Sequence, residues 1–588
     1  MLLPPTRPSR HHRLLADISR PAVREGPESP LAKHESILLV LLLAGPAAAQ
    51  VPPDPVEPAH EAPAPGGPRP AVAPPTFAEL EAAQARIGDV RVVTRDIFDI
   101  DDPAEDRRPF RWANALHVKT RPEVVERALL FKSGEPVSVR LIEETERLLR
   151  STTYLYDVRI RPLAVCDGLV DIEVATRDTW TLDPGLKAGR AGGTNTSSIS
   201  LKEDNLLGTG VALGVSRING VDRSGTQVDL AVDRAFGSWT SVSLSRARNG
   251  DGRRDAVAVV RPFYALDARW AAGASFSRDA RIDPVYDAGR SVAEYRRREN
   301  RGEVFGGWSA GLVDGWVQRW SLGTSLQDDG YAADPGRVAP ARLPADEKLV
   351  APFVRYELIE DRFEKLDNRN LIGRPEFFAL GLAASVQLGR AMPALGSSRA
   401  AWVYAGSVGR GFEPLAGQLL TVTASAQGHQ EDGRAHRQHL GLQARYYLPL
   451  SARWLVYAGA SADVLRNPEP TELLPLGGDN GLRGYPLRWQ AGTRRALFTL
   501  EERFYTDLFP LRLFRVGGAA FFDIGRAWGG DGAGRADAPW QRNVGVGLRF
   551  FSVRTAFNNV LHVDLAFPLD TDAGIKRVQL LVKTRASF

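Results

Sequence analysis

Short segments in which polar and apolar residues alternate recur from about residue 180 to the C-terminus, and this pattern restricts the fold most. Examples are TQVDLAVD, TSVSLSRA, LFTLEERFY and VGVGLRFF, separated by clusters of Gly, Asp, Asn and Arg. A period of two residues is typical of strands that have one apolar and one polar face. Helical periodicity is absent from this part of the sequence, so the C-terminal two-thirds is expected to be antiparallel β-sheet.

Alternation does not say which face meets water. A soluble sandwich or propeller turns its apolar face to a core, whereas a membrane barrel turns it to lipid. In the last segment, KRVQLLVKTRASF, one face carries Val578, Leu580, Val582 and Phe588, and the other face is largely polar. A terminal phenylalanine resembles the C-terminal assembly signal of bacterial outer-membrane proteins, so Phe588 favours a transmembrane β-barrel.

The number of strands follows from the chain length. At roughly 25 residues for each strand with its connection, residues 180–588 give about 16 strands, an even number as bacterial barrels require. The first strand is expected near TLDPGLKAGRAGG, where Pro184 and several glycines weaken pairing. It would close against the last strand, residues 578–588, at a poorly zipped seam that opens sideways.

The N-terminal region is expected to direct export. Residues 1–49 form a leader in which the apolar run Ile37–Leu43 precedes Ala47–Ala49, the pattern of a secretory signal peptide. Residues 1–32 fit that pattern badly, so the true translation start stays open. Residues 50–87 are rich in Pro and Ala and are expected to form a disordered linker. The one cysteine, Cys166, excludes an internal disulfide.

Residues 88–179 are expected to form a small α/β domain. VRVVTRDIF predicts a strand, RPEVVERALLF and VSVRLIEETERLLRS predict two helices, and two alternating strands follow. The order β-α-α-β-β resembles a POTRA domain, the periplasmic module of outer-membrane assembly factors. A polar insertion at residues 99–109 departs from that pattern, and a generic α/β domain is the alternative. An exposed edge of its sheet could accept an extended client chain as an added strand.

The loop GGDNGLRGYP lies between two predicted strands. It resembles the long loop motif of the BamA/TamA superfamily, in which an arginine-glycine-aromatic tripeptide folds back into the barrel. The resemblance makes Arg483, Gly484 and Tyr485 the motif residues. A cation partly screened from water requires a fixed anion, and Asp523 in GGAAFFDIGRAWGG resembles the acid of the superfamily that receives it. Glu501 and Glu502 are the rival partners.

A third match is LKEDNLLGTGVALGVS, which is similar to the second barrel strand of that superfamily and the glycine-rich turn after it. Its motif residues are Asn205, Gly208 and Gly210. The order of these matches resembles the BamA/TamA superfamily of outer-membrane assembly factors, also called bacterial surface antigens, over most of residues 88–588. The resemblance implies an outer-membrane protein of a Gram-negative bacterium, with the POTRA-like domain in the periplasm.

The resemblance also implies a function and partners. The barrel would insert or translocate unfolded outer-membrane or secreted polypeptides through a lateral gate, in contact with the lipid bilayer and lipopolysaccharide and with a periplasmic or inner-membrane companion protein. One alternative is a two-partner-secretion transporter for one dedicated client, although such transporters usually have two POTRA units and a plug helix. The other is a passive porin or structural barrel, which lacks a periplasmic α/β module.

Other functions find no support in the sequence. HExxH, GxSxG, paired-cysteine and phosphate-loop motifs are absent, so we expect no enzyme activity, no cofactor and no metal. The 75 basic and 70 acidic residues nearly balance, so no nucleic-acid partner is expected. The sequence does not identify the client, decide between insertion and secretion, or reveal whether a second, degenerate POTRA domain exists.

Overall fold

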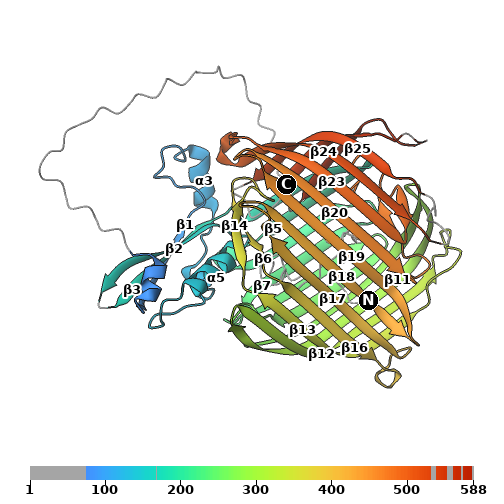
Figure 1. Cartoon of the computed structure of the whole chain (residues 1–588). Helices are drawn as coiled ribbons and strands as arrows, with labels where there is room; N and C mark the ends of the chain where they lie inside the picture. Colours follow the sequence, from blue (N-terminus) through green and yellow to red (C-terminus); the bar gives the residue numbers. More distant parts are fainter. Residues whose placement is uncertain are drawn as a thin grey trace, which may run out of the picture.

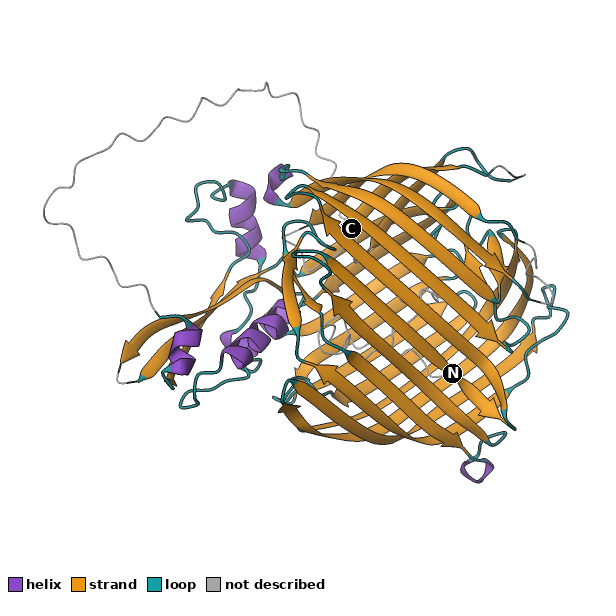
Figure 2. Ribbon diagram, in the orientation of Figure 1, coloured by secondary structure: helices purple, strands orange, loops and turns teal. Residues whose placement is uncertain are grey.

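A computed structural model describes residues 75–166, 168–530, 538–552, 560–570, 572 and 574–585. The expected signal peptide, the expected linker up to residue 74, and Phe588 lie outside the described residues. An α/β domain precedes a large barrel along the chain. Figures 1 and 2 show the domain outside one end of the barrel.

The α/β domain contains the predicted β-α-α-β-β order. Its elements are α2 (Phe77–Ala82), β1 (Arg86–Arg95), α3 (Arg108–Leu116), α4 (Pro122–Glu126), α5 (Val139–Arg150), β2 (Leu155–Cys166) and β3 (Leu169–Asp178). The sheet order is β1-β3-β2, with β1 parallel and β2 antiparallel to β3. Helices α4 and α5 bury Val125, Ile142 and Leu149 against Val170 and Ile172 of β3, which forms the core of the domain.

Two helices of this domain were not expected. Helix α2 begins inside the range predicted as linker, because Thr76 and Glu79 form a reciprocal capping box at its N-terminus. The predicted linker therefore ends earlier than residue 87. Helix α3 begins in the last two residues of the polar insertion. The ring of Phe110 stacks on that of Phe98 at 4.2 Å between centroids, which attaches this helix to the segment that follows β1.

Twenty strands of the described residues form a closed antiparallel barrel. In chain order they are β4 (Leu182–Ala191), β5 (Thr194–Glu203), β6 (Val211–Asn219), β7 (Ser224–Ala235), β8 (Thr240–Asn249), β9 (Gly252–Arg261), β10 (Trp270–Asp287), β11 (Arg290–Val313), β12 (Trp316–Ala333), β13 (Glu347–Glu360), β16 (Ala383–Ala391), β17 (Ala401–Phe412), β18 (Leu419–Glu431), β19 (Arg434–Pro449), β20 (Trp454–Arg466), β23 (Arg494–Tyr505), β24 (Phe514–Trp528), β25 (Gln541–Ser552), β26 (Val560–Pro568) and β27 (Gln579–Arg585). Each strand pairs with the next along the chain, and β27 pairs with β4.

The prediction of about 16 strands was wrong. It assumed that long loops at one end of the barrel alternate with short turns at the other. At the end opposite the α/β domain, where long loops were expected, several connections contain only two residues, as at 250–251, 288–289 and 432–433. These turns use fewer residues than the expected loops, and the remaining residues form additional strands. The predicted first strand is confirmed as β4, and long connections do occur at 334–346 and between β24 and β25.

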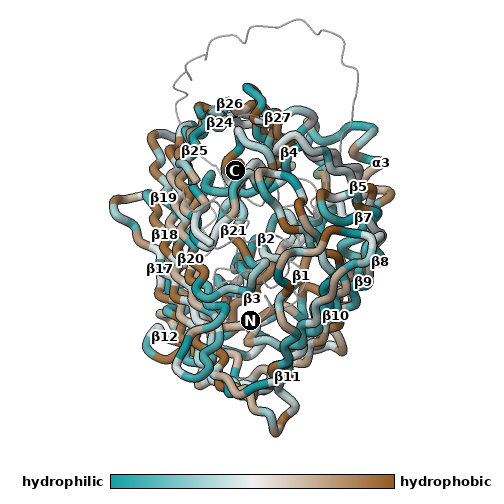
Figure 3. Tube along the Cα trace, turned by 90° about the vertical axis from the view of Figure 1, so that its right-hand side faces the viewer, coloured by the Kyte–Doolittle hydropathy of each residue, from teal (hydrophilic) through white to brown (hydrophobic). Residues whose placement is uncertain are grey.

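The apolar face of the barrel strands points outward. On β25 the side chains of Val544, Val546 and Leu548 are exposed, whereas those of Asn543 and Arg549 are buried inside. The alternation of teal and brown along the strands is visible in Figure 3. A soluble sheet would bury its apolar face, whereas this barrel exposes it.

A row of aromatic side chains crosses four neighbouring strands near one end of the barrel. Trp270 of β10 is in register with Trp308 of β11, which is in register with Trp320 of β12 and then Tyr356 of β13. The tryptophans are at least 48% exposed. They lie near the ends of the strands on the side of the α/β domain, because the chain enters β4 from this domain and successive connections alternate between the two ends.

Two short hairpins lie between barrel strands. Hairpin β14 (Phe363–Asp367) with β15 (Pro375–Ala379) follows β13 at the end that carries the α/β domain, as Figure 1 shows for β14. Hairpin β21 (Leu474–Leu476) with β22 (Gln490–Gly492) follows β20 at the opposite end. Within the described residues, no helix has the length and apolar character needed to cross a membrane.

Candidate functional site

The connection between β20 and β23, residues 467–493, folds back into the barrel. The hairpin β21–β22 forms its base, and the residues between these two short strands reach the inner wall. Leu476, Leu482 and Tyr485 pack with Ala527 of β24, and each is fully buried. This connection, which we call the arginine loop, holds Arg483 with 2% of its surface exposed.

The predicted pair between Arg483 and Asp523 is present. The Arg483 Nε lies 2.8 Å from Asp523 Oδ2, and Nη2 lies 2.7 Å from Oδ1, a bidentate geometry. The rival Glu501 is a second partner, with its Oε1 at 2.7 Å from Nη1, while Glu502 is exposed on the other face of β23. The guanidinium also lies over the ring of Phe521, at 3.4 Å from the centroid. A buried cation is thus compensated by two carboxylates and an aromatic face.

Neighbouring side chains orient Asp523 on β24. The Thr499 hydroxyl donates to Asp523 Oδ1 over 2.9 Å, and the Asn543 amide donates to Oδ2 over 2.8 Å. The side-chain Oδ1 of the same Asn543 accepts from the backbone N–H of Gly484 over 3.2 Å. A Cβ at position 484 would lie 2.7 Å from the Cβ of Asn543, so this close approach requires glycine.

Tyr485 fixes the loop to the ends of β25 and β26. Its hydroxyl lies 2.8 Å from the carbonyl oxygen of Arg542 and 3.1 Å from a carboxylate oxygen of Asp570. The three predicted motif residues, Arg483, Gly484 and Tyr485, therefore contact four successive strands of one wall, β23 to β26, in the half of the barrel away from the α/β domain.

The opposite wall holds the loop through contacts that the sequence did not reveal. Arg488 Nη1 lies 2.6 Å from Asp222 in the connection between β6 and β7, and its guanidinium stacks on Tyr286 at 4.3 Å. Asp222 and Arg488 are 266 residues apart, and no local pattern marks either one. The arginine loop consequently crosses the lumen and is attached on both sides.

The loop also touches both strands of the seam. Among the described residues, β27 pairs with β4 only at Val582 and Arg190, whereas β4 pairs with β5 along its whole length. Lys583 of β27 donates to the carbonyl oxygen of Asp479 over 2.6 Å. At the end of β4, Gly192 packs so closely on the loop that a Cβ would lie 2.1 Å from the backbone N of Leu487.

The predicted motif Asn205, Gly208 and Gly210 is not part of this site. It forms the turn between β5 and β6 at the opposite end of the barrel, where it contacts the α/β domain. The Asn205 amide donates to the Thr120 hydroxyl over 2.8 Å, and the Gly208 carbonyl accepts from the Arg121 N–H over 3.0 Å. These residues attach the domain to the barrel.

Helix α5 makes a second attachment, to the connection between β9 and β10. The buried Glu144 carboxylate accepts from the Leu266 N–H over 2.7 Å, and Arg140 forms an ion pair with Asp267. Burial raises the pKa of Glu144, although the hydrogen bond from Leu266 and the charges of Arg147 and Arg140 oppose this effect. The domain is thus fixed to the barrel at two separate turns.

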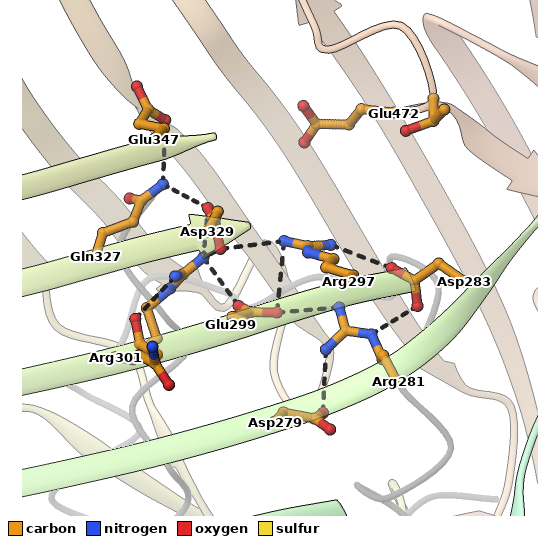
Figure 4. Close-up of polar contacts among 12 residues, drawn as sticks. Asp279, Arg281, Asp283, Arg297, Glu299, Arg301, Gln327, Asp329, Glu347 and Glu472 are labelled. Carbon is orange, nitrogen blue, oxygen red and sulfur yellow. Dashed lines mark hydrogen bonds and ion pairs between the residues drawn. The ribbon is translucent and has the colours of Figure 1, made fainter. Parts of the chain in front are cut away.

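Charged side chains cover the inner wall of β10 to β13 (Figure 4). Arg301 of β11 lies 2.9 Å from Glu299 and 2.8 Å from Asp329 of β12. Arg437 of β19 lies 3.4 Å from Asp329 and 3.6 Å from Glu472, which belongs to the arginine loop. The start of the loop is thereby joined to the network of the long strands. The alternation of these strands predicts their polar face but not this pairing.

In the part of the chain that the structure describes, no group of three or more His, Cys, Asp or Glu side chains is arranged to hold a metal ion. Neither a family model nor a curated protein matches this sequence.

Several solved structures are similar in fold. BamA from Haemophilus ducreyi lacking POTRA domains 1–3 has 14% identity and a TM-score of 0.40, over 85% of this chain and 85% of that chain. CdiB from Escherichia coli has 12% identity and a TM-score of 0.44, over 85% and 76% of the two chains. CdiB from Acinetobacter baumannii has 11% identity and a TM-score of 0.38, over 85% and 73%. These values are too low to indicate what this chain binds or does.

Proposed function

We propose that this protein is an outer-membrane barrel that inserts polypeptides into the membrane or translocates them across it. The observation that carries the proposal is the seam, where β27 and β4 share one registered pair among the described residues. Backbone groups that lack a partner at such a joint can pair with another strand. The seam therefore offers client strands a pairing site that is missing in a barrel whose strands are all fully hydrogen-bonded.

The surface of the barrel supports the membrane location. Its exposed apolar side chains surround the cylinder, and the row from Trp270 to Tyr356 matches the aromatic girdle of a membrane barrel. The α/β domain then lies on the periplasmic side, next to this girdle. The arginine loop lies at the extracellular side and crosses the lumen, an arrangement that favours a closed, gated barrel over a passive porin.

A reconstitution assay tests the proposal. The full-length protein is placed in liposomes, and a urea-unfolded outer-membrane polypeptide is added as the client. We expect the client to become protease-resistant and heat-modifiable on gels several-fold faster than in liposomes that hold an ordinary porin. Equal rates in the two preparations would contradict the proposal. Client recovered in the vesicle interior instead of the bilayer would assign the chain to translocation, the function of a dedicated secretion transporter.

The α/β domain is the proposed receptor for extended clients, in the manner of a POTRA domain. At β1 the outer edge is already partly covered, because the N–H of Ile87 donates to the Glu135 carbonyl over 2.8 Å. Strand β2 is the other edge of the sheet, and it is the edge on which a client strand would add.

Deletion of residues 88–178 is expected to slow client delivery several-fold in the same assay. The control is the heat-modifiability of the barrel itself, which shows whether the deleted variant still folds. The variant Arg140→Ala keeps the domain but removes its ion pair with Asp267 of the barrel. It therefore separates the docking of the domain on the barrel from the capture of clients. If a folded barrel without the domain delivers clients at the full rate, the domain is not the receptor.

A further inference from the structure

The hairpin β14–β15 lies against the inner wall of the barrel at the end that carries the α/β domain. Its tip, residues 368–374, contacts strands well away from β13 and β16, which flank it. The Tyr447 hydroxyl of β19 donates to Asn370 Oδ1 over 2.8 Å. The Tyr505 hydroxyl of β23 donates to the Asn368 carbonyl, also over 2.8 Å. The hairpin therefore extends across this end of the lumen.

Hydrogen bonds and apolar packing order the tip of the hairpin. One oxygen of Glu376 accepts hydrogen bonds from three successive backbone N–H groups, those of residues 369, 370 and 371, over 2.8 to 3.1 Å. Ile372 and Leu380 are each 2% exposed and belong to an apolar cluster with Leu455 and Phe551 of the wall. Backbone bonds to a single carboxylate and burial of aliphatic side chains hold the tip in one conformation.

A chain of contacts on β23 joins this tip to the arginine loop. Glu501 Oε1 accepts from Arg483 at 2.7 Å, and Oε2 of the same carboxylate accepts from Arg503 Nε at 3.0 Å. Arg503 Nη1 then donates to the carbonyl oxygen of Arg369 in the hairpin tip over 2.9 Å. Glu501 and Arg503 are two residues apart on one strand, so both point into the lumen.

We propose that the β14–β15 hairpin is a second closure of the barrel, and that Glu501 and Arg503 couple it to the arginine loop. The two closures stand at opposite ends of the lumen, and each binds a different atom of this charged pair. The role of this coupling in client passage rests on the proposed function. A client chain that enters the lumen from the periplasm would meet the hairpin first. The coupling itself is a property of the barrel alone.

The coupling follows from the balance of charges around Glu501. With Arg483 in place, the carboxylate is shared between two guanidinium groups, and Arg503 keeps a donor free for Arg369. When Arg483 is withdrawn, Arg503 is the remaining hydrogen-bond partner that the described residues supply to the buried Glu501 carboxylate. Arg503 therefore gains by moving toward Glu501. The carbonyl of Arg369 then loses a charge-assisted hydrogen bond, which weakens the attachment of the hairpin.

Accessibility of the hairpin tip tests this proposal without a client. Cys166 is replaced by serine, and Ile372→Cys places one thiol in the buried tip. The reagent is a maleimide attached to a polyethylene glycol chain too bulky to enter the lumen, applied to the full-length protein in detergent. Arg483→Met, a change at the far end of the lumen, is expected to accelerate labelling of the thiol about tenfold, the equilibrium effect of losing one hydrogen bond to a charged group. Arg503→Met is expected to do at least as much.

The matched control is Arg223→Met. Arg223 is also buried and ion-paired, with Asp251 and Asp279, and among the described residues its side chain bonds to neither closure. Unchanged labelling in folded Arg483→Met protein, or equal acceleration by Arg223→Met, would overturn the proposal. If Arg483→Met does not give a heat-modifiable barrel, Arg483→Lys takes its place with the same criteria, since lysine cannot bind Asp523 and Glu501 in the fork geometry. A positive result here together with failed client delivery would refute the proposed function and leave the coupling intact.

Discussion

Arg483→Met is expected to release the arginine loop and to destabilise the barrel by about 3–5 kcal/mol, the cost of leaving buried carboxylates without their cation. Asp523 and Glu501 both lose a guanidinium partner, and both are at most 2% exposed. The urea concentration at which the barrel loses heat-modifiability should fall. Protease should also cut within residues 477–489, each of which is buried or half-buried in the wild-type protein.

Arg488→Met is the matched comparison for this result. It removes the attachment of the same loop to the opposite wall, but its partner Asp222 is more exposed, at 11% of its side chain. We therefore expect a smaller loss of stability than with Arg483→Met. Equal losses of stability in the two variants would show that the contacts of Arg483 contribute no more to stability than those of Arg488.

A charge exchange tests the pair itself. Arg483→Asp and Asp523→Arg should each be as harmful as Arg483→Met or worse, because each places like charges together in a buried site. The double variant should recover part of the stability. Recovery is incomplete because Glu501 still faces position 483, where it now meets an aspartate. A double variant no more stable than either single one would refute a direct interaction between positions 483 and 523.

The features that the sequence predicted depend on local patterns or on a strong physical requirement. The two-residue period of segments such as VGVGLRFF predicted strands, and β25 has its apolar side chains outside and Asn543 inside. Arg483 required an anion to compensate its charge, and the resemblance of GGAAFFDIGRAWGG to the strand motif of the BamA/TamA superfamily singled out Asp523. Glu501 was ranked only as a rival, since nothing in the sequence shows that one cation can be shared by two strands.

The features that the sequence missed depend on distances along the chain or on turn lengths. Arg488 meets Asp222 across the lumen only because the barrel closes. The hairpin within residues 361–382 has its tip folded by Glu376 and held by Arg503, and the strand period does not reveal either contact. Strand number failed for a similar reason: a two-residue turn such as 288–289 is invisible when both flanking strands continue the same alternation.

The arginine loop is attached to both strands of the seam. The loop accepts a hydrogen bond from Lys583 on β27 and packs on Gly192 at the end of β4. Separation of these two strands must break at least one of the contacts, whereas an intact loop holds both strands from inside. Opening of the seam is therefore expected to require movement of the loop, and this makes the seam the place where a covalent block should have the largest effect on function.

A disulfide across the seam is expected to abolish client delivery. Arg190 and Val582 are registered partners on β4 and β27, and paired residues of antiparallel strands have Cα atoms about 4.5–5.5 Å apart, within the range that a disulfide spans. The variant Arg190→Cys/Val582→Cys, in a Cys166→Ser background, should lose nearly all delivery when oxidised and regain it with a reducing agent. The barrel should stay folded throughout, since the crosslink joins strands that are already neighbours.

The control disulfide uses the same position on β27 but the other neighbour. Val563 of β26 is the registered partner of Val582 across a fully paired joint, so Val563→Cys/Val582→Cys locks two strands that have no reason to separate. This variant should deliver clients at the same rate whether oxidised or reduced. Full delivery by the oxidised Arg190→Cys/Val582→Cys protein would exclude passage through the seam. Loss of delivery in both oxidised variants would mean that β27 must move as a whole, and not that the joint with β4 opens.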